Sequence, residues 1–318
     1  MILRDADPAR LAESPRAASE LIHGDCLDKM KALDAGRYRL IISSPPYNIG
    51  KAYEREDSRS LSEYIEWQDS VIDRAFELLS PDGSICWQVG NFVRDREYIP
   101  LDILSYNLFA KRGLKLRNRI IWRYNFGHNQ DRRFSGRYET ILWFTKADEY
   151  VFNLDPVRVP QLYPGKRHAS HKQGKAGQPS GNPKGKNPAD YWEFSAERDF
   201  VENPVWDLPN LRAGHPEKTA HPCQFPIELA ERCILALTSE NDWILDPFVG
   251  TGSALIAAAK HQRNGTGIDR DAGYLDIARA RIHAFHQGEL PMRPSGKPVR
   301  RPSSTEKVAQ IPQEWAAE

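Results

Sequence analysis

Three features are scarce in this sequence, and each scarcity limits what the protein can be. No stretch of about 18 consecutive apolar residues occurs, so we expect no membrane-spanning helix. The N-terminal stretch Met1–Asp7 carries acidic residues where a signal peptide needs an apolar core. The four cysteines (Cys26, Cys86, Cys223 and Cys233) lack the spacing of metal ligands, which predicts reduced thiols in a cytoplasmic protein and no metal site.

A large excess of charge of one sign is also absent. The 44 Lys and Arg residues nearly balance the 43 Asp and Glu residues, which leaves a formal net charge of +1. Any affinity for nucleic acid must therefore come from local clusters of charge. The 318 residues, 40% of them hydrophobic, suffice for a sizeable core in one large domain or two small ones.

Acidic residues are missing altogether between residues 156 and 189, where basic residues gather among frequent glycines and prolines. This pattern predicts little regular structure and suits contact with a DNA backbone, with a solvated loop as the plainer alternative. Arg132 and Arg133, in the predicted loop 125–136, suit phosphate contact in the same way. The residues predicted to bind DNA are Arg132, Arg133, Arg158, Lys166, Arg167, Lys172, Lys175, Lys184 and Lys186.

The apolar run 40–42 is typical of a buried strand, and it stops at Ser44-Pro45-Pro46-Tyr47. The prolines have no N–H and a fixed φ, so the chain leaves the sheet as a stiff loop. The loop presents carbonyl oxygens, a hydroxyl and an aromatic ring, which suit a flat ligand that carries an amino group. Taken alone, the motif equally fits a strand that ends in a Pro-Pro turn.

A second motif runs from Asp246 to Ser253, with the sequence D-P-F-V-G-T-G-S. It is typical of a nucleotide-binding strand–turn–helix unit, and Asp269 follows at the distance where an acid takes ribose hydroxyls. The third glycine of a pyrophosphate site is absent. Because Asp246 would repel phosphate but pair with a cationic amino acid group, the motif favours S-adenosylmethionine over NAD.

Hydrophobic periodicity predicts an α/β fold with a doubly wound, mostly parallel sheet. Strands are predicted at 20–26, 40–42, 84–89, 118–124, 137–146, 243–246 and 265–269, and helices at 27–33, 60–79, 99–111, 226–237, 254–260 and 271–285. We expect an N-terminal arm (1–17), a catalytic half (18–150), a target-recognition insert (151–210), a cofactor-binding half (211–287) and a disordered tail (288–318).

The two motifs and the basic segment between them resemble the amino-group DNA methyltransferases over about residues 18–285. The order is S-P-P-Y, a basic variable segment, then H-P-x-x-x-P-x-x-L from His221 and D-P-F-x-G-x-G from Asp246. This order is the circular permutation of the β class. The resemblance implies a Rossmann-like methyltransferase sheet, S-adenosylmethionine as cofactor and double-stranded DNA as substrate. It also admits a homodimer, a restriction endonuclease encoded alongside, and a prokaryotic, nucleoid-associated location.

The resemblance also implies roles for single residues. The methionine part of the cofactor is expected on the glycine turn, the ribose on Asp269 and the adenine beside Asp25, with the His221 loop closing the pocket. The predicted cofactor-binding residues are Asp25, Cys26, His221, Pro222, Gln224, Asp246, Pro247, Phe248, Gly250, Gly252, Ser253 and Asp269. Phe225 departs from the pattern, because a lysine often stands there in the family.

The predicted catalytic residues are Ser44, Pro45, Pro46 and Tyr47. The target base is flipped out of the duplex, and its amino protons bond to the Ser44 hydroxyl and the Pro45 carbonyl while Tyr47 stacks on the base. Proton loss then follows methyl transfer. No cysteine follows the prolines, which disfavours methylation of a ring carbon.

Several alternatives remain open at this stage. In the family, Ser at the first motif position usually accompanies cytosine N4 and Asp accompanies adenine N6, and a neutral hydroxyl can donate to cytosine N3 as well as accept. We therefore predict cytosine N4, with adenine N6 as the alternative. An enzyme of the same chemistry that acts on RNA or on a protein glutamine is a further alternative. Protein-glutamine enzymes resemble this chain less, because their Gly-rich motif precedes the Pro-Pro-Tyr motif and they lack a basic insert. A non-enzymatic DNA-binding protein would need neither motif.

Overall fold

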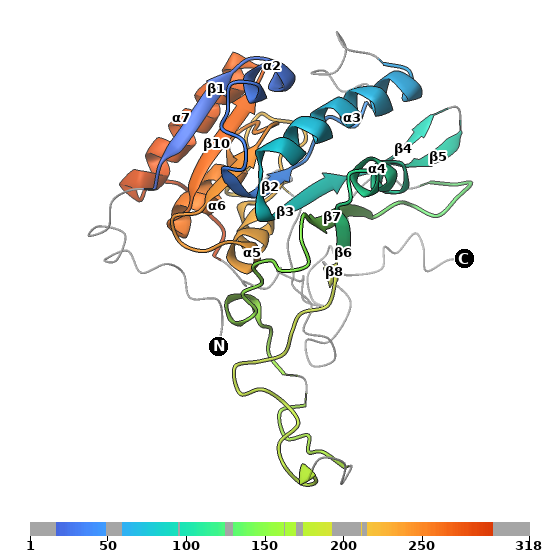
Figure 1. The fold of residues 1–318 in the computed structure, drawn as a ribbon, viewed down its shortest axis with the longest axis vertical. Helices are drawn as coiled ribbons and strands as arrows, with labels where there is room; N and C mark the ends of the chain where they lie inside the picture. Colours follow the sequence, from blue (N-terminus) through green and yellow to red (C-terminus); the bar gives the residue numbers. More distant parts are fainter. Residues whose placement is uncertain are drawn as a thin grey trace, which may run out of the picture.

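The central element of the computed structural model is an eight-stranded sheet of order β1-β10-β9-β2-β3-β7-β6-β8 (Figure 1). The structure describes residues 17–48, 59–94, 96–124, 130–161, 163–169, 174–192, 211 and 215–294. The strands are β1 (Ser19–His23), β2 (Tyr38–Ser43), β3 (Leu79–Val89), β6 (Lys115–Arg123), β7 (Tyr138–Thr145), β8 (Tyr191–Trp192), β9 (Trp243–Asp246) and β10 (Asn264–Asp269).

The pairing of the strands confirms the predicted fold class. The neighbours from β1 through β10, β9 and β2 to β3 are all parallel. Strand β7 is antiparallel to both β3 and β6, and β8 pairs with β6 in parallel. The sheet is thus mixed but mostly parallel.

Helices cover both faces of the sheet, because successive side chains of a buried strand point to opposite sides. Leu40 and Ile42 of β2 face the core shared with α5 (Ile227–Leu237), α6 (Ser253–Lys260) and α7 (Ala272–Gln287). Ile41 faces the core shared with α2 (Cys26–Met30), α3 (Leu61–Leu78) and α4 (Leu101–Ala110). Each such fully buried side chain contributes about 1.5–3 kcal/mol. Two cores on one sheet make the fold doubly wound.

Helix α3 begins where the sequence predicts. Ser60 and Glu63 form a capping box, in which the Ser60 hydroxyl accepts from the Glu63 N–H and the Glu63 carboxylate accepts from the Ser60 N–H. The reciprocal bonds satisfy two N–H groups that the helix itself cannot pair. They define the end of α3 that carries Tyr64 and Trp67.

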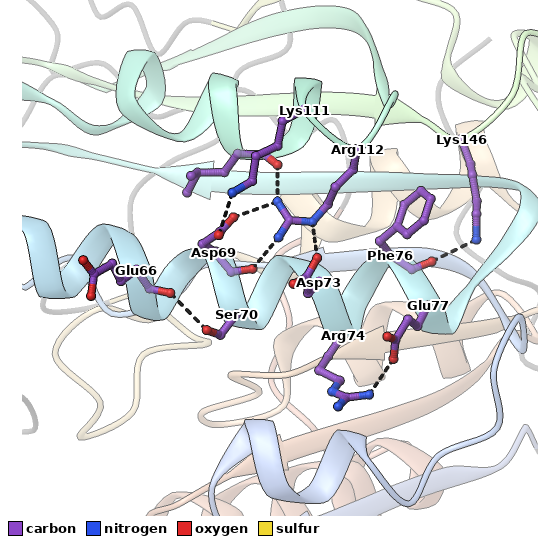
Figure 2. A network of polar contacts seen from close by, with 11 residues as sticks. Glu66, Asp69, Ser70, Asp73, Arg74, Phe76, Glu77, Lys111, Arg112 and Lys146 are labelled. Atoms are coloured by element: carbon purple, nitrogen blue, oxygen red, sulfur yellow. Dashed lines mark hydrogen bonds and ion pairs between the residues drawn. The ribbon is translucent and has the colours of Figure 1, made fainter.

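Ion pairs anchor the middle of α3 to the end of α4 (Figure 2). The Arg112 guanidinium donates to the Asp73 carboxylate at 2.6 Å and to the Asp69 carbonyl at 2.9 Å, and Lys111 donates to the Asp69 carboxylate at 2.6 Å. At the far end of the helix, Lys146 donates to the Phe76 carbonyl at 2.9 Å. These contacts hold α3 in one position on the sheet.

Several predicted boundaries differ from the structure, and two of the differences are informative. The helix predicted from Ile99 begins at Leu101, because a hairpin of β4 (Asn91–Arg94) and β5 (Glu97–Pro100) precedes it. The strand predicted from Ser84 begins at Leu79, so the sequence Ser80-Pro81-Asp82-Gly83 lies inside β3. Tyr38 pairs with Leu79 and Leu40 pairs with Ser84, so the residues between 79 and 84 bulge out of the pairing.

The basic segment leaves the sheet after β7 and returns as β8 (Figure 1). A short 3₁₀ helix, η2 (Asp155–Val157), begins it, and isolated bridges join Val159 to Lys186 and Arg167 to Pro179. The segment therefore folds back on itself, although regular structure was not predicted there. It projects from the body of the molecule, and we refer to residues 158–186 as the basic extension.

The outer parts of the predicted domain scheme lie largely beyond the described residues. The arm is described only at residue 17 and the tail only to residue 294. Helix α7 ends with Gly288 in the left-handed conformation, one residue past the predicted end of the cofactor-binding half. None of the helices that the structure describes is long and apolar enough to cross a membrane.

Candidate active site

A cavity lies where the order of the parallel strands reverses. β9 and β2 are neighbours, from which the sheet continues to β10 and β1 on one side and to β3 on the other. The loops that follow β1, β2, β9 and β10 leave the same edge, which is where open α/β sheets bind ligands. They enclose a cavity of about 440 Å³, a volume suited to a small-molecule ligand.

The cavity brings together most of the residues predicted for the site. Its wall includes Asp25, Cys26, Ser44, Pro45, Pro46, Tyr47, His221, Gln224, Pro247, Phe248, Gly250, Ser253 and Asp269. Pro222, Asp246 and Gly252 are not in the wall. Asp246 and Gly252 are buried behind it, and Pro222 is exposed. The Ser43 hydroxyl donates to the Asp246 carboxylate, although the two residues are 203 positions apart in the sequence. Two motifs some 200 residues apart thus meet at one site.

Asp246 is completely buried at the end of β9. Its Oδ1 atom accepts from the Ser43 hydroxyl at 2.5 Å and from the Phe248 N–H at 3.1 Å, whereas its Oδ2 atom has no hydrogen-bond partner. Burial raises the pKa of this carboxyl group to about 7. A buried carboxylate oxygen without a partner is costly unless a ligand pairs with it, and an ammonium group is suited to do so.

The glycine turn after β9 has the geometry that the motif predicts. Gly250 has φ of +48° and Gly252 has φ of +83°, and glycine adopts such left-handed values without steric cost. The Gly250 N–H donates to Asp269 Oδ2 at 2.8 Å, and the Asp271 N–H donates to Asp269 Oδ1 at 2.9 Å. Asp269 therefore connects the turn to the end of β10 and faces the cavity.

Asp25 and Cys26, the two predicted residues after β1, have different roles in the structure. The Asp25 carboxylate caps α2 by accepting from the Leu27 N–H at 2.9 Å. Burial raises the pKa of Cys26 to about 12, so its thiol is neutral at ordinary pH and is no nucleophile. Both residues shape the wall of the cavity.

The loop around His221 lies over the glycine turn. His221 Nδ1 accepts from the Cys223 N–H at 3.1 Å, and burial lowers the pKa of the ring to about 4. The neutral ring therefore carries its proton on Nε2. The Gln224 side chain holds the loop together, because its oxygen accepts from the Thr219 hydroxyl at 2.8 Å and its nitrogen donates to the Glu217 carbonyl at 2.8 Å.

The Ser-Pro-Pro-Tyr loop is held by a hydrogen bond from α3, by one to β7 and by one within the loop itself. The Tyr64 hydroxyl of α3 donates to the Pro46 carbonyl at 2.9 Å. The Tyr47 hydroxyl lies 2.8 Å from Ser44 Oγ and 3.2 Å from Glu139 Oε2. The Tyr47 ring is only 8% exposed, which leaves much less of it free for stacking on a base than the sequence suggested.

Some residues of the site were missed from the sequence. Glu139 was predicted only as part of a strand, although it is the one charged residue of β7. Trp67 of α3 lines the cavity and packs against Phe248, with ring centroids 5.6 Å apart. Only its place on an amphipathic helix was visible in the sequence. Other wall residues that were not predicted include Arg59, Cys223, Phe225, Arg270, Asp271 and Tyr274.

The structure places the residues predicted to contact DNA in different surroundings. Lys166, Arg167 and Lys175 are exposed on the basic extension. Arg158 and Lys184 instead form ion pairs with Asp155, which lies one position before the acid-free stretch.

The other residues predicted to bind DNA lie near the base of the basic extension, in the loop before β7, or outside the described residues. Lys186 pairs with Val159 close to the base of the extension. Arg132 is exposed, and Arg133 lies over the Tyr98 ring at 5.4 Å. Lys172 lies outside the described residues. Within the described segments, no group of three or more His, Cys, Asp and Glu side chains could hold a metal ion.

The fold is shared with known DNA methyltransferases. The PvuII DNA methyltransferase, a cytosine-N4-specific enzyme, superimposes with a TM-score of 0.60 over 87% of this chain and 96% of its own, at 16% identity. At that identity the likeness concerns the fold alone. The fold and the cavity together define the class of Rossmann-like methyltransferases, and in this chain the Ser-Pro-Pro-Tyr loop precedes the glycine turn.

Comparisons of sequence define the family. The sequence model of the DNA methylase family, which covers N6 and N4 enzymes, matches residues 38–280. The type II methyltransferase M.BglII of Bacillus subtilis is 41% identical over 261 residues, which cover 82% of this chain and 68% of the relative. The DNA adenine methyltransferase YhdJ of Escherichia coli is 29% identical over 83% of each chain. The chain therefore belongs to the N6/N4 family of DNA methylases and is an S-adenosylmethionine-dependent DNA methyltransferase.

Proposed function

We propose that the protein methylates the N4 amino group of cytosine at specific sites in double-stranded DNA. The observation that carries this proposal is Ser44, a neutral hydroxyl at the first position of the catalytic loop, in the wall of a cavity that also contains the glycine turn. In the family this position usually holds Ser in cytosine-N4 enzymes and Asp in adenine-N6 enzymes. Ser44 therefore supports cytosine.

The cofactor half of the cavity suits S-adenosylmethionine. The unpartnered Oδ2 atom of Asp246 would pair with the ammonium group, and Asp269 would accept from the ribose hydroxyls with its remaining lone pairs. Phe248 and Trp67 give the wall its apolar surface. Bound in this way, the cofactor supplies an electrophilic methyl group.

The catalytic loop would hold the flipped base by its amino group. Ser44 Oγ and the Pro45 carbonyl would each accept one N–H bond, which favours a pyramidal nitrogen with an available lone pair. Because Tyr64 anchors Pro46 and Glu139 engages Tyr47, the acceptors are held in place before the base arrives. Positioning of this kind accounts for much of the rate in such reactions.

Adenine N6 is the second candidate, because the family includes enzymes of both kinds and one relative is a DNA adenine methyltransferase. The amino group of adenine would bond to the same two acceptors. The partners implied by the resemblance, a second copy of the chain and a restriction endonuclease, remain predictions, as does a cytoplasmic location.

Expression in a host that lacks its own DNA methylation tests the proposal. The genomic DNA is digested to nucleosides and analysed by mass spectrometry. We expect N4-methylcytosine, and N6-methyladenine without N4-methylcytosine would move the assignment to adenine. Methyl groups found only in RNA or protein would contradict a DNA substrate.

A further inference from the structure

A carboxyl group lies next to the catalytic loop, and neither sequence motif includes it. Glu139 Oε2 accepts from the Tyr47 hydroxyl at 3.2 Å and from the Gln88 amide at 2.5 Å, and the Tyr124 hydroxyl is a further partner. The Tyr47 hydroxyl lies 2.8 Å from Ser44 Oγ. Glu139, Tyr47 and Ser44 thus form a continuous chain of hydrogen bonds that ends in the cavity wall.

This chain has a direction, because each hydroxyl has a single proton to donate. An ionised carboxylate can only accept, so Tyr47 must donate its proton to Glu139. The Tyr47 oxygen then accepts from Ser44, which uses the only proton that Ser44 has. The lone pairs of Ser44 Oγ are left for the cavity, where they can accept but not donate.

We propose that Glu139 is a positioning residue which, through Tyr47, makes Ser44 an obligate hydrogen-bond acceptor for the amino group of the target base. The proposal rests on the proposed function, in that an amino group is the partner of Ser44, and it holds for cytosine and adenine alike. If Glu139 were protonated, it would donate to Tyr47, and Tyr47 would donate to Ser44. Ser44 would then direct its proton at the amino group, whose delocalised lone pair is a poor acceptor.

The surroundings of Glu139 allow this reversal. Burial raises the pKa of the Glu139 carboxyl group, although the bonds from Gln88, Tyr47 and Tyr124 oppose the rise. Burial also raises the pKa of Tyr47 and of Tyr124, so both stay neutral while the carboxyl group titrates.

Farther along the same contacts, the charged or titratable neighbours are Tyr98 and Arg137 beside Tyr124, and Cys223 and Tyr124 beside Tyr47. The ionised form of Glu139 is the active one. Activity is therefore complete above the raised pKa of Glu139 and falls as the pH falls through it.

The direction of the chain also bears on the choice of base. A Ser44 hydroxyl that donates to Tyr47 cannot donate to cytosine N3 at the same time. Ser44 would then favour cytosine through its lack of negative charge, and not through a second hydrogen bond.

The Glu139→Gln variant tests the proposal, because it keeps the shape of the side chain and removes the ionisation. With saturating S-adenosylmethionine and unmethylated DNA, we expect kcat to fall by about tenfold or more while KM for DNA changes by less than about twofold. The low-pH decline in kcat should disappear. Glu20→Gln is the matched control, because Glu20 is a part-buried, hydrogen-bonded carboxylate in β1, outside the cavity wall.

A double-mutant cycle with Tyr47→Phe separates positioning from a structural role. Without the Tyr47 hydroxyl the chain is broken, so adding Glu139→Gln should lower kcat by less than about twofold further. If Glu139→Gln does not fold, Tyr47→Phe alone should already lack the low-pH decline. Wild-type kcat with an unchanged pH profile in Glu139→Gln, or additive effects in the cycle, would overturn the proposal.

An infrared difference titration gives a readout that does not depend on activity. The signal of a protonated carboxyl group should appear in the wild-type protein above the pH range of an ordinary glutamate and be absent from Glu139→Gln. A signal confined to the ordinary range would overturn the proposal, whatever base is methylated. Methylation of adenine with the expected variant effects would refute the cytosine assignment and leave this inference standing.

Discussion

The cavity and the basic extension are both marked by the sequence as functional, yet they are built in opposite ways. At the cavity, Asp269 and Gln224 in the wall and Asp246 behind it are each held by hydrogen bonds within the protein. On the extension, Lys166 and Lys175 are exposed. Methyl transfer requires groups fixed in advance, whereas phosphate binding requires only cations that can displace counterions. Substitutions at the cavity should therefore act by disturbing fixed contacts, whereas substitutions in the basic extension should act by changing the number of positive charges.

Asp246→Asn should show the largest effect, because it keeps the shape of the side chain and removes the charge expected to pair with the ammonium group. We expect the affinity for S-adenosylmethionine to fall by about a hundredfold or more, in line with the loss of a buried charged partner. Asp246→Ala should abolish measurable binding. Isothermal titration calorimetry checks both, with the exposed Asp276→Asn as control. Near-native affinity in Asp246→Asn would remove the assignment.

Gly90→Ala tests whether the catalytic loop depends on fixed geometry. A Cβ atom at Gly90 would come within 2.9 Å of the Tyr47 ring, so the ring and the attached hydroxyl must shift. We expect kcat to fall by on the order of ten- to a hundredfold, with unchanged affinity for S-adenosylmethionine. Gly36→Ala provides a comparison, since no atom lies within 4 Å of a Cβ there, although its positive φ carries some strain. A wild-type kcat in Gly90→Ala would show that the loop tolerates movement.

The pH dependence of cofactor affinity distinguishes the two regions further. The raised pKa of Asp246, about 7, means that its carboxylate must lose a proton to pair with an ammonium group. Affinity for S-adenosylmethionine should rise by about tenfold per pH unit below that value and level off above it. Calorimetry in buffers of different ionisation enthalpy should detect proton release at pH 6. Asp246→Asn should abolish that release, and its persistence in the variant would assign it to another group.

The raised pKa of Asp246 also predicts how the stability of the free protein depends on pH. The pKa of Asp246 in the folded protein lies above its unfolded value of about 3.9. Its contribution to the free energy of unfolding is therefore complete below pH 4 and is lost as the pH rises through about 7. Asp246→Asn should therefore gain stability relative to the wild type as the pH rises through that range. Denaturant unfolding at several pH values measures the difference, and parallel curves for the two proteins would contradict it.

The basic extension should show the smallest effect for each residue. Lys166→Ala, Arg167→Ala and Lys175→Ala should each weaken DNA binding several-fold and lower the slope of log affinity against log salt by about one. Lys184→Ala is the matched comparison, because its ion pair with Asp155 already neutralises part of its charge. Fluorescence anisotropy over a range of salt concentrations measures the slopes. Unchanged slopes in all variants would mean that the extension is a solvated loop.

The sequence predicted the fold and the geometry of the glycine turn well because both depend on local patterns. The conformation of Gly250 and the position of Asp269 follow from a motif of a few residues and the strand after it. Glu139 could not be predicted in the same way. It reaches Tyr47 only because β7 pairs with β3 in a register that sets Thr140 opposite Val89. Such pairing across some 50 residues leaves no local signal.

In the basic extension, the sequence composition did not reveal which charges are paired. Its acid-free composition drew attention to Arg158 and Lys184, but the acid that neutralises them, Asp155, stands just outside that stretch. Composition counts charges, whereas the fold decides which of them are paired.

The central claim is that one cavity holds both the methyl donor and the amino group of a base, with Ser44 as acceptor. It is tested most directly by incubating purified protein with unmethylated DNA and trideuteromethyl-labelled S-adenosylmethionine, then analysing the nucleosides by mass spectrometry. We predict labelled N4-methylcytosine from the wild type and little or none from Ser44→Ala. Equal amounts of labelled product from Ser44→Ala and wild type, or a label found only outside exocyclic amino groups, would contradict the account.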